Sequence, residues 1–264
     1  MLREVTAVRY VTPLREGGSM PGLVEADDHQ LYALKWSGAA QGRKALVAEV
    51  LAGELGRGLG LPVPELVRVD LDPVLARSEP EQQIQEQMRA SGGLNVGLAF
   101  LSGAFNFDPL CFEVDPLQAG RVLWFDALIG NVDRSWRNPN LLVAGGALRL
   151  IDHGASLIFH HHWAGAANWI RRPYDAGDHA LVRFAPDLAA AGRGLAALAT
   201  PALLERAAAA IPDEFLLDEP GFANPQAVRA AYVAQLTARL AGPRDWLPAL
   251  PEVPPLPPLD EVTL

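Results

Sequence analysis

Cysteine is almost absent from this sequence, because Cys111 is the only one among 264 residues. A single cysteine excludes an internal disulfide and is typical of proteins from a reducing cytoplasm, where we expect this one. Runs of about eighteen or more apolar residues are also absent, so no membrane-spanning helix is predicted. The opening "MLREVTAVRY" lacks the continuous apolar core of a secretory signal peptide.

Basic residues are scarce as well. There are 22 lysines and arginines against 31 acidic residues, which gives a formal net charge of −9. A nucleic-acid-binding protein needs a basic face that collects phosphates, so we expect neither nucleic acid nor a membrane as a partner. Lysine is the rarest base, with only Lys35 and Lys44. The apolar share of 50% and the charged share of 20% are those of a globular protein with a core.

Alternating and periodic apolar residues predict a strand-rich first part and a helical second part. The first part should contain strands at 23–28, 30–36, 64–71 and 94–101, one main helix at 42–60 and a polar helix at 80–91. The second should contain helices at 117–131, 176–184, 201–210 and 226–241, with a hairpin of strands 140–143 and 148–152. The fold class is therefore α+β, divided near 101–103 and followed by a proline-rich tail from about 242.

Lys35 lies in the predicted strand "YALKW", where it shares a face with Leu31 and Ala33. A charged side chain on such an apolar face needs an anionic partner. The next helix offers Glu49 and Glu54. A strand lysine paired with a helix glutamate can hold nucleotide phosphates. The alternative is an edge lysine whose amine reaches solvent.

The loop "REGGSMPG" before these strands contains Gly17, Gly18 and Gly22 around Ser19. Glycines in a loop between strands let backbone N–H groups approach phosphate oxygens. An ordinary hairpin loop is the alternative interpretation.

Short polar side chains bracket the predicted 140–152 hairpin. Asp133, Asn138 and Asn140 precede its first strand, and Asp152 follows its second. A carboxylate on each side of a hairpin can point toward one place, and such oxygens suit Mg²⁺, which takes one or two carboxylates plus phosphates. Asn and Asp residues that cap turns are the alternative explanation.

Four stretches together resemble the HipA-like kinases, which are relatives of the protein-kinase and phosphoinositide-kinase fold: "ALKW", "AEVLAGELGRGLGLPVPE", "FDALIGNVDRSWRNPNLLV" and "LRLIDHG". The resemblance implies a two-lobed phosphotransferase that uses ATP and Mg²⁺. Residues 1–102 would form a β-rich N-lobe with one main helix, and residues 103–264 a mostly helical C-lobe. The acceptor would be a hydroxyl of a protein or of a small molecule. The alternative is an inactive nucleotide-binding regulator, but inactive relatives usually lose part of this polar set.

The resemblance also implies roles for individual residues. Asp133 would be the catalytic aspartate, Asp152 a metal ligand, and Lys35 the phosphate-binding lysine. Family spacing selects Glu49 as the partner of Lys35, whereas a helical wheel favours Glu54; we expect Glu49. Further residues implied for ATP are Gly17, Gly18 and Ser19 over the phosphates, and Phe100, Leu101 and Ser102 at the hinge that receives adenine. A serine in the phosphate loop, here Ser19, can be phosphorylated by such a kinase itself.

The sequence departs from the family pattern at several points. Ser135 stands where a histidine is common, and His153 follows the metal aspartate. The family spacing gives Asn138 as the second metal ligand, while Asn140 directly precedes the strand as in protein kinases; we favour Asn140 and keep Asn138. The histidines at 160–162 could suggest zinc, although neighbouring histidines rarely converge on one ion. The N-terminal domain of toxin-type members does not precede these motifs, so we expect no toxin–antitoxin role.

Overall fold

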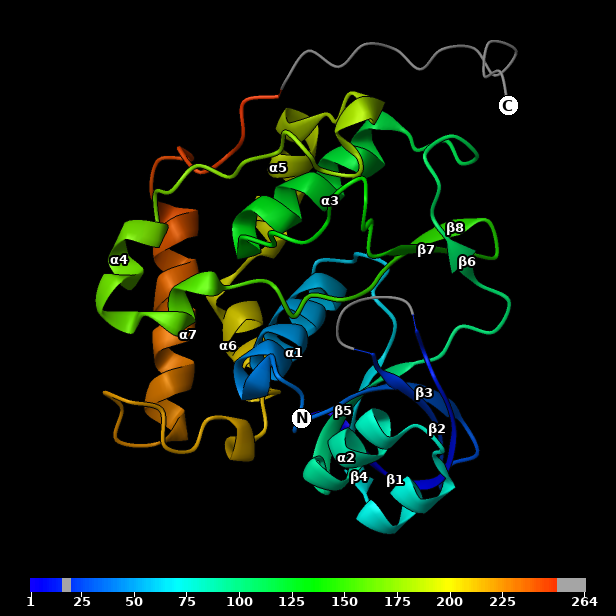
Figure 1. The fold of residues 1–264 in the computed structure, drawn as a ribbon. Helices are drawn as coiled ribbons and strands as arrows, with labels where there is room; N and C mark the ends of the chain where they lie inside the picture. The colour runs from blue at the N-terminus through cyan, green and yellow to red at the C-terminus, as the bar shows by residue number, and fades with distance from the viewer. Residues whose placement is uncertain (16–19, 251–264) are drawn as a thin grey trace.

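A closed barrel of five strands forms most of the N-terminal part of the molecule (Figure 1). The structure is a computed structural model that describes residues 1–15 and 20–250. The strands are β1 (Arg3–Pro13), β2 (Gly22–Ala26), β3 (Leu31–Lys35), β4 (Leu66–Leu71) and β5 (Gly93–Ala99). β1 pairs antiparallel with β2 and parallel with β4, and β5 pairs with both β3 and β4. Closure leaves no free edge, so the barrel buries its own core.

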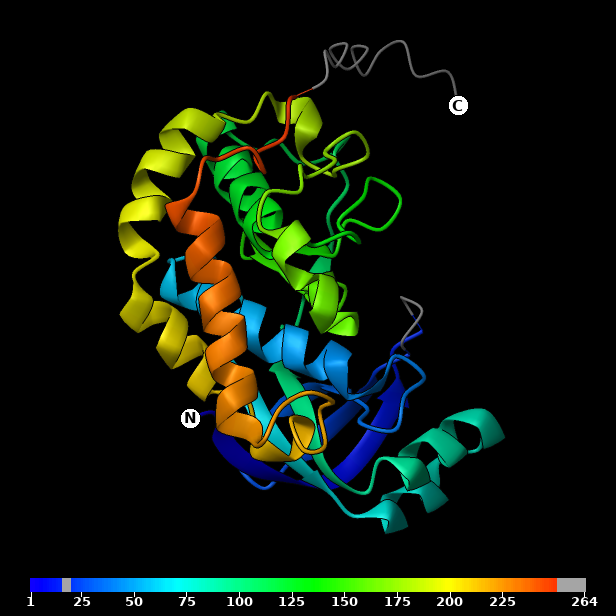
Figure 2. The same cartoon turned by 90° about the vertical axis from the view of Figure 1, so that its left-hand side faces the viewer.

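The helix α1 (Gly42–Gly58) lies between the barrel and the helical part of the chain (Figures 1 and 2). It ends where Gly60 adopts a left-handed backbone and Pro62 prevents continuation. The small residues along it allow close packing: Gly53 faces Leu66 of the barrel, and Gly58 faces Leu203 of the helical part. α1 therefore joins the two parts through one shared core.

Four longer helices build the second part: α3 (Pro116–Ile129), α5 (Leu188–Leu198), α6 (Pro201–Ala209) and α7 (Pro225–Ala241). Three of them begin with a polar cap followed by proline, and the cap side chains of Asp115, Thr200 and Asn224 accept hydrogen bonds from the first turn. Such pairs satisfy N–H groups that the helix cannot satisfy itself, while proline needs no partner at that position.

Shorter elements complete the chain. A three-stranded sheet consists of β6 (Phe105–Asn106), β7 (Leu141–Ala144) and β8 (Ala147–Leu150). The remaining helices are α2 (Gln82–Ala90), α4 (Ala166–Trp169) and the 3-10 turns η1 (Pro73–Ser78), η2 (Ile158–His161), η3 (Trp163–Gly165), η4 (Val182–Phe184) and η5 (Asp213–Phe215). None of the helices in the described ranges has both the length and the apolar character needed to cross a membrane.

The architecture confirms the predicted α+β class and the two-lobed arrangement. The exact division between 102 and 103 stays a prediction. The predicted helix at 176–184 is wrong, because only Val182–Phe184 forms a single 3-10 turn. His179 is drawn instead into a β-bridge with Ser135 and a contact with buried Asp126.

A helix that the sequence did not predict, α5, forms just after this segment. Its glycines lower the helix propensity of the segment, so the sequence pattern did not predict a helix there. Asp187 caps its first turn. Gly192 brings it close to Trp124 of α3. Packing against α3 thus decides the helical state of this segment.

Candidate functional site

A cavity of about 430 Å³ lies between the two parts of the molecule, bounded by the end of β3, the start of α1 and the segments that flank the β7–β8 hairpin. Four residues selected from the sequence line it together: Lys35, Asp133, Asn138 and Asp152. The fold thus gathers these side chains from three separated stretches of chain.

Lys35 is the centre of a charged cluster at this cavity. Its Nζ donates hydrogen bonds of 2.6 Å to Glu49 Oε2 and of 2.6 Å to Asp152 Oδ1. The residue is the last of β3, and its side chain lies opposite the barrel-facing Leu34. The other candidate on α1, Glu54, contacts Arg57 instead, at 3.3 Å. The ion pair between strand and helix is therefore formed by Lys35 and Glu49.

The charges of this cluster hold one another ionised. Burial alone would lower the pKa of the Lys35 amine, but Glu49 and Asp152 outweigh burial and raise the pKa above its ordinary value. Burial alone would raise the pKa of Glu49, but Lys35 and His153 lower it well below its usual range. Glu49 is only 1% exposed. A buried carboxylate in this position therefore stays charged and fixes the amine at the cavity wall.

Asp152 reaches the cavity because the chain turns sharply after β8. Its backbone is left-handed, with φ of 54°, a conformation that aspartate tolerates better than most residues. The next amide, His153 N, donates to Glu49 Oε2 at 2.7 Å. The His153 ring is fully buried and packs edge-on against Phe125 of α3. The turn is thus anchored to α1 and α3.

Asp133 is held by three asparagines. Asn138 Nδ2 donates to Asp133 Oδ2 at 3.1 Å, and Asn140 Nδ2 donates to the same oxygen at 3.2 Å and to the Asp133 carbonyl at 2.8 Å. Asn131 Oδ1 accepts from Asp133 N at 3.1 Å. Among the described residues, Asn138 lines the cavity and Asn140 does not.

A buried ionic network beneath this loop was not predicted from the sequence. Arg134 Nε donates to Asp126 Oδ2 at 2.6 Å, and His179 Nε2 lies 3.1 Å from the same oxygen. Arg134 also donates to the carbonyls of Asn140 and Ile151, which are the residues at the two ends of the hairpin. The network therefore ties the Asp133 loop to both ends of the hairpin that carries Asp152.

One sequence signal could have identified the network. Asp126 sits in "WFDALIGN", inside the apolar run of the predicted helix, where a carboxylate requires a partner. Burial alone would raise its pKa, but Arg134 and His179 lower the pKa to about 2. Gly130 ends α3 in a left-handed conformation and directs the chain into the loop.

Other candidate residues lie elsewhere. Phe100, Leu101 and Ser102 connect β5 to β6, and in the described part of the chain they are not among the residues that line this cavity. Gly17, Gly18 and Ser19 fall outside the described residues. His160 is buried with its Nδ1 2.9 Å from the Tyr232 hydroxyl.

The donor chemistry of the cavity fits Mg²⁺ and phosphate. No group of three or more His, Cys, Asp or Glu side chains in the described ranges could hold a metal ion. Mg²⁺, however, is usually bound by one or two carboxylates together with waters and substrate phosphates. Asp152 and the Asp133–Asn138 pair offer such oxygens beside the cation of Lys35. The set is incomplete for a structural metal site and suitable for a metal that arrives with a nucleotide.

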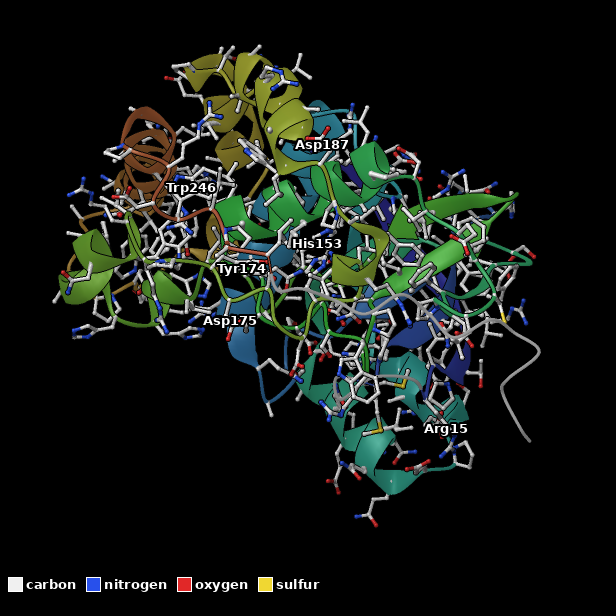
Figure 3. The ribbon with its side chains drawn as sticks, turned by 90° about the horizontal axis from the view of Figure 1, so that it is seen from above. Arg15, His153, Tyr174, Asp175, Asp187 and Trp246 are labelled. Carbon is white, nitrogen blue, oxygen red and sulfur yellow. The ribbon has the colours of Figure 1, made fainter. Side chains whose placement is uncertain are left out.

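The segment around Tyr174 contacts the loop that carries Asp133. Tyr174 N donates to the carbonyl of Trp246, so the C-terminal segment runs beside it (Figure 3). The Tyr174 hydroxyl donates to Asn131 O at 2.7 Å. This contact supports the backbone just before Asp133.

Comparison with known proteins shows the family. Residues 7–176 match the model of the HipA-like kinase family. The chain belongs to the HipA-like kinases. No curated protein matches the sequence.

One solved kinase structure shares the fold of this chain. The crystal structure of the Helicobacter pylori proinflammatory kinase CtkA aligns with a TM-score of 0.57 at 12% identity, over 90% of this chain and 94% of that one. The Golgi casein kinase aligns with a TM-score of 0.43 at 12% identity, over 90% of this chain and 71% of that one. The structure of that kinase with Mn/ADP bound aligns with a TM-score of 0.44 at 11% identity, over 90% of this chain and 72% of that one. At such identity the CtkA match shows the fold alone.

Proposed function

We propose that this HipA-like kinase transfers the γ-phosphate of ATP, bound with Mg²⁺, to a hydroxyl group. The observation that carries the proposal is the contact of Lys35 with both Glu49 and Asp152 at the wall of the cavity that Asp133 also lines. Phosphoryl transfer depends on positioning and on charge stabilisation, and these residue types supply both.

Each residue has a task in this reaction. Lys35, fixed by Glu49, holds nucleotide phosphates. Asp152, with Asn138 or Asn140, holds Mg²⁺, which when bound neutralises charge on the phosphates. Asp133 orients the acceptor hydroxyl and receives its proton. Its carboxylate is held in place by Asn138 and Asn140, so it is positioned before the acceptor arrives.

The rest of the nucleotide site is proposed from the sequence. Phe100, Leu101 and Ser102 receive the adenine, and Gly17, Gly18 and Ser19 cover the phosphates through backbone N–H groups. We place the reaction in the cytoplasm, because Cys111 is the only cysteine.

Binding and turnover of Mg-ATP test the proposal separately. With ligand at 100 times Kd the free energy of unfolding should rise by about 2.7 kcal/mol. For a chain of this length such a gain is a rise of roughly 5–10 °C in Tm. Asp152→Asn should abolish the part of the shift that depends on Mg²⁺. An unchanged Tm in saturating Mg-ATP contradicts the proposal, and binding without any ADP release supports the inactive regulator.

A further inference from the structure

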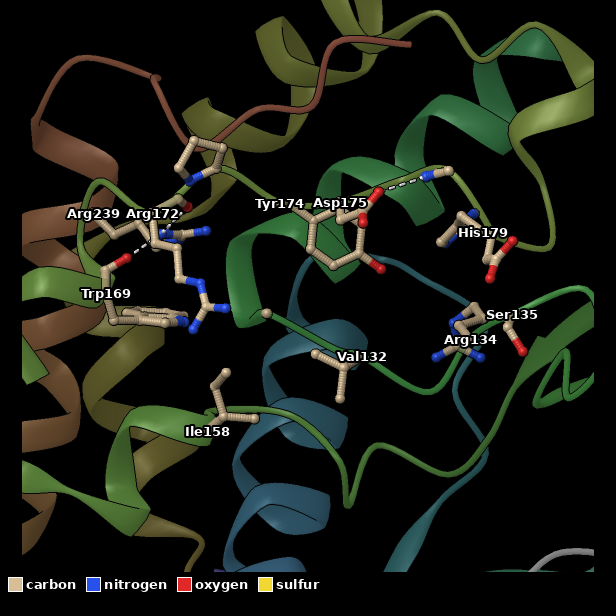
Figure 4. A pocket seen from close by; sticks show the side chains of 14 residues that line it. Val132, Arg134, Ser135, Ile158, Trp169, Arg172, Tyr174, Asp175, His179 and Arg239 are labelled. Atoms are coloured by element: carbon tan, nitrogen blue, oxygen red, sulfur yellow. Dashed lines mark hydrogen bonds between the residues drawn. The ribbon is translucent and has the colours of Figure 1, made fainter. Parts of the chain in front are cut away.

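A second cavity, of about 510 Å³ (Figure 4), adjoins the first, as their shared wall residues show. The two share Val132 and Ile158 in their walls. Val132 is 64% exposed, which is unusual for a large apolar side chain in the middle of a polar loop. The cavities therefore meet beside Asp133, the residue that follows Val132.

The loop around Asp133 separates the two spaces. Asp133 lines the first cavity, whereas Arg134 and Ser135 line the second. Because Val132 and Ile158 line both cavities, a molecule in the second cavity can extend past them toward Asp133. This is the position that a phosphate acceptor needs, across the catalytic loop from the nucleotide.

One end of the second cavity carries a free cation. The Arg172 side chain extends beside Trp169 into the space facing Val132 (Figure 4). In the part of the chain that the structure describes, its guanidinium makes neither a hydrogen bond nor an ion pair, although its backbone does. The neighbouring Arg171, in contrast, pairs with Asp245 at 3.4 Å and does not line the cavity.

A second arginine adds positive charge at the same end. Arg239 is 1% exposed and lies over the Trp169 ring, 4.2 Å from its centre. Its guanidinium donates only to backbone carbonyls, including Trp169 O and Ala127 O, and no carboxylate of the described residues neutralises it. Burial lowers its pKa to about 9, which leaves it charged at neutral pH. A buried cation without a counter-charge favours an anion nearby.

The opposite end of the cavity is acidic. Asp175 and Asp178 line it near Ser135 and His179. Asp175 Oδ1 accepts a hydrogen bond from Gly177 N, and Asp178 is 3.9 Å from Arg137, which is too long for a strong pair. Arg134 at this end is already paired with Asp126, so the two carboxylates leave a negative charge that repels an anionic group. Such a group is therefore directed to the Arg172 end.

We propose that this cavity is the acceptor site and that it takes a small hydroxyl compound with a carboxylate or phosphate group, bound by Arg172. This inference rests on the proposed function. The cavity volume lies within the roughly 300–1,000 Å³ that is usual for small-molecule sites. The acceptor oxygen forms a bond to the γ-phosphorus, the bond from that phosphorus to the β,γ-bridging oxygen breaks, and ADP leaves. The hydroxyl proton goes to Asp133.

The experiment measures ADP release from Mg-ATP with fractions of a deproteinised, low-mass extract of the source organism. The fractions are those retained and those not retained by an anion exchanger. Glycerate, glycerol 3-phosphate and glycerol serve as defined probes of the carboxylate, phosphate and neutral classes. The proteins are wild type, Arg172→Ala, Arg172→Lys and the matched control Arg171→Ala, each also tested for the Mg-ATP shift in Tm.

The proposal expects stimulation by the retained fraction. Arg172→Ala should raise the acceptor KM at least tenfold with little change in the KM for ATP. Arg172→Lys should recover part of the loss, and Arg171→Ala should match wild type. Equal behaviour of Arg172→Ala and Arg171→Ala overturns the proposal, as does stimulation confined to the fraction that the anion exchanger does not retain. Wild type that binds Mg-ATP but responds to no low-mass anion also overturns it, whereas absence of Mg-ATP binding is the failure of the proposed function itself.

Discussion

Two ionic networks lie on either side of the Asp133 loop, and they differ in access to solvent. In the Lys35 network the side chains of Lys35 and Asp152 are 14% and 32% exposed, and both line a cavity. In the Asp126 network the side chains of Asp126, Arg134 and His179 are all 0% exposed. The open network can exchange a partner for a ligand. The closed network exposes no side-chain surface, although Arg134 and His179 belong to the wall of the second cavity, and it holds backbone in place.

The closed network should dominate stability. Asp126→Ala leaves Arg134 buried without its counter-charge, so we expect the free energy of unfolding to fall by about 3–5 kcal/mol. Urea denaturation measures it. The matched control is Asp178→Ala, whose exposed carboxylate is 3.9 Å from Arg137 and should change stability by less than about 0.5 kcal/mol. Similar losses in the two variants would remove the distinction between the networks.

Substitutions at the first cavity should have the largest effect on turnover. In the proposed reaction Asp133 receives the proton, so in Asp133→Ala the rate of transfer should fall by about 10²–10⁴-fold. Because the proposed role of Asp133 concerns the acceptor and not the nucleotide, the Tm shift with Mg-ATP should remain. ADP release and thermal denaturation in the same samples check both parts. Wild-type turnover in this variant would mean that another group receives the proton.

Glu49 and Glu54 allow the same comparison, of a buried with a partly exposed ion pair, within the single helix α1. Glu49→Gln removes the charge beside Lys35, and the loss of a buried charged hydrogen bond should cost about 1.5–3 kcal/mol and raise the KM for ATP. Glu54→Gln removes only a partly exposed contact with Arg57, which is worth less than about 1 kcal/mol. Equal effects on the KM for ATP would show that α1 acts only as a scaffold.

Acid should weaken the closed network in a defined pH range. The folded pKa of Asp126 is about 2, below the value of about 3.9 for an unfolded aspartate. Its stabilisation is therefore complete above about pH 4 and is lost as the pH falls toward 2. The difference in unfolding free energy between wild type and Asp126→Asn, followed by urea denaturation, should shrink over this interval. A difference that does not vary with pH would place the stabilising effect elsewhere.

The smallest effect should separate the two asparagines. Asn138 lines the cavity, so Asn138→Ala should raise the Mg²⁺ concentration needed for half-maximal ADP release by roughly several-fold, because an oxygen that can bind the metal is lost. Asn140→Ala should lower turnover more than Mg²⁺ affinity, because its amide supports both the carbonyl and the carboxylate of Asp133. A larger Mg²⁺ effect for Asn140→Ala would reverse the assignment.

The local sequence pattern was sufficient to predict most of the helices and strands. The strands β2 to β5, α1, α3 and the β7–β8 hairpin have apolar periodicities and turn residues that do not depend on the rest of the chain, so their sequence predictions agree with the structure. The same holds for Lys35, because a cation on an apolar strand face requires a partner wherever the strand lies. The sequence could limit that partner to α1 but could not choose between two glutamates.

Tertiary structure decided the remaining features, because they depend on groups distant in the chain. Glu49 and not Glu54 meets Lys35, since packing of α1 against Leu66 and Leu203 fixes which of its sides faces the barrel. The segment 176–184 has helical periodicity but is held by the contact of His179 with Asp126, 53 residues earlier. A buried imidazole without a hydrogen-bond partner costs more than a short helix gains, so the contact of His179 with Asp126 prevails over local propensity.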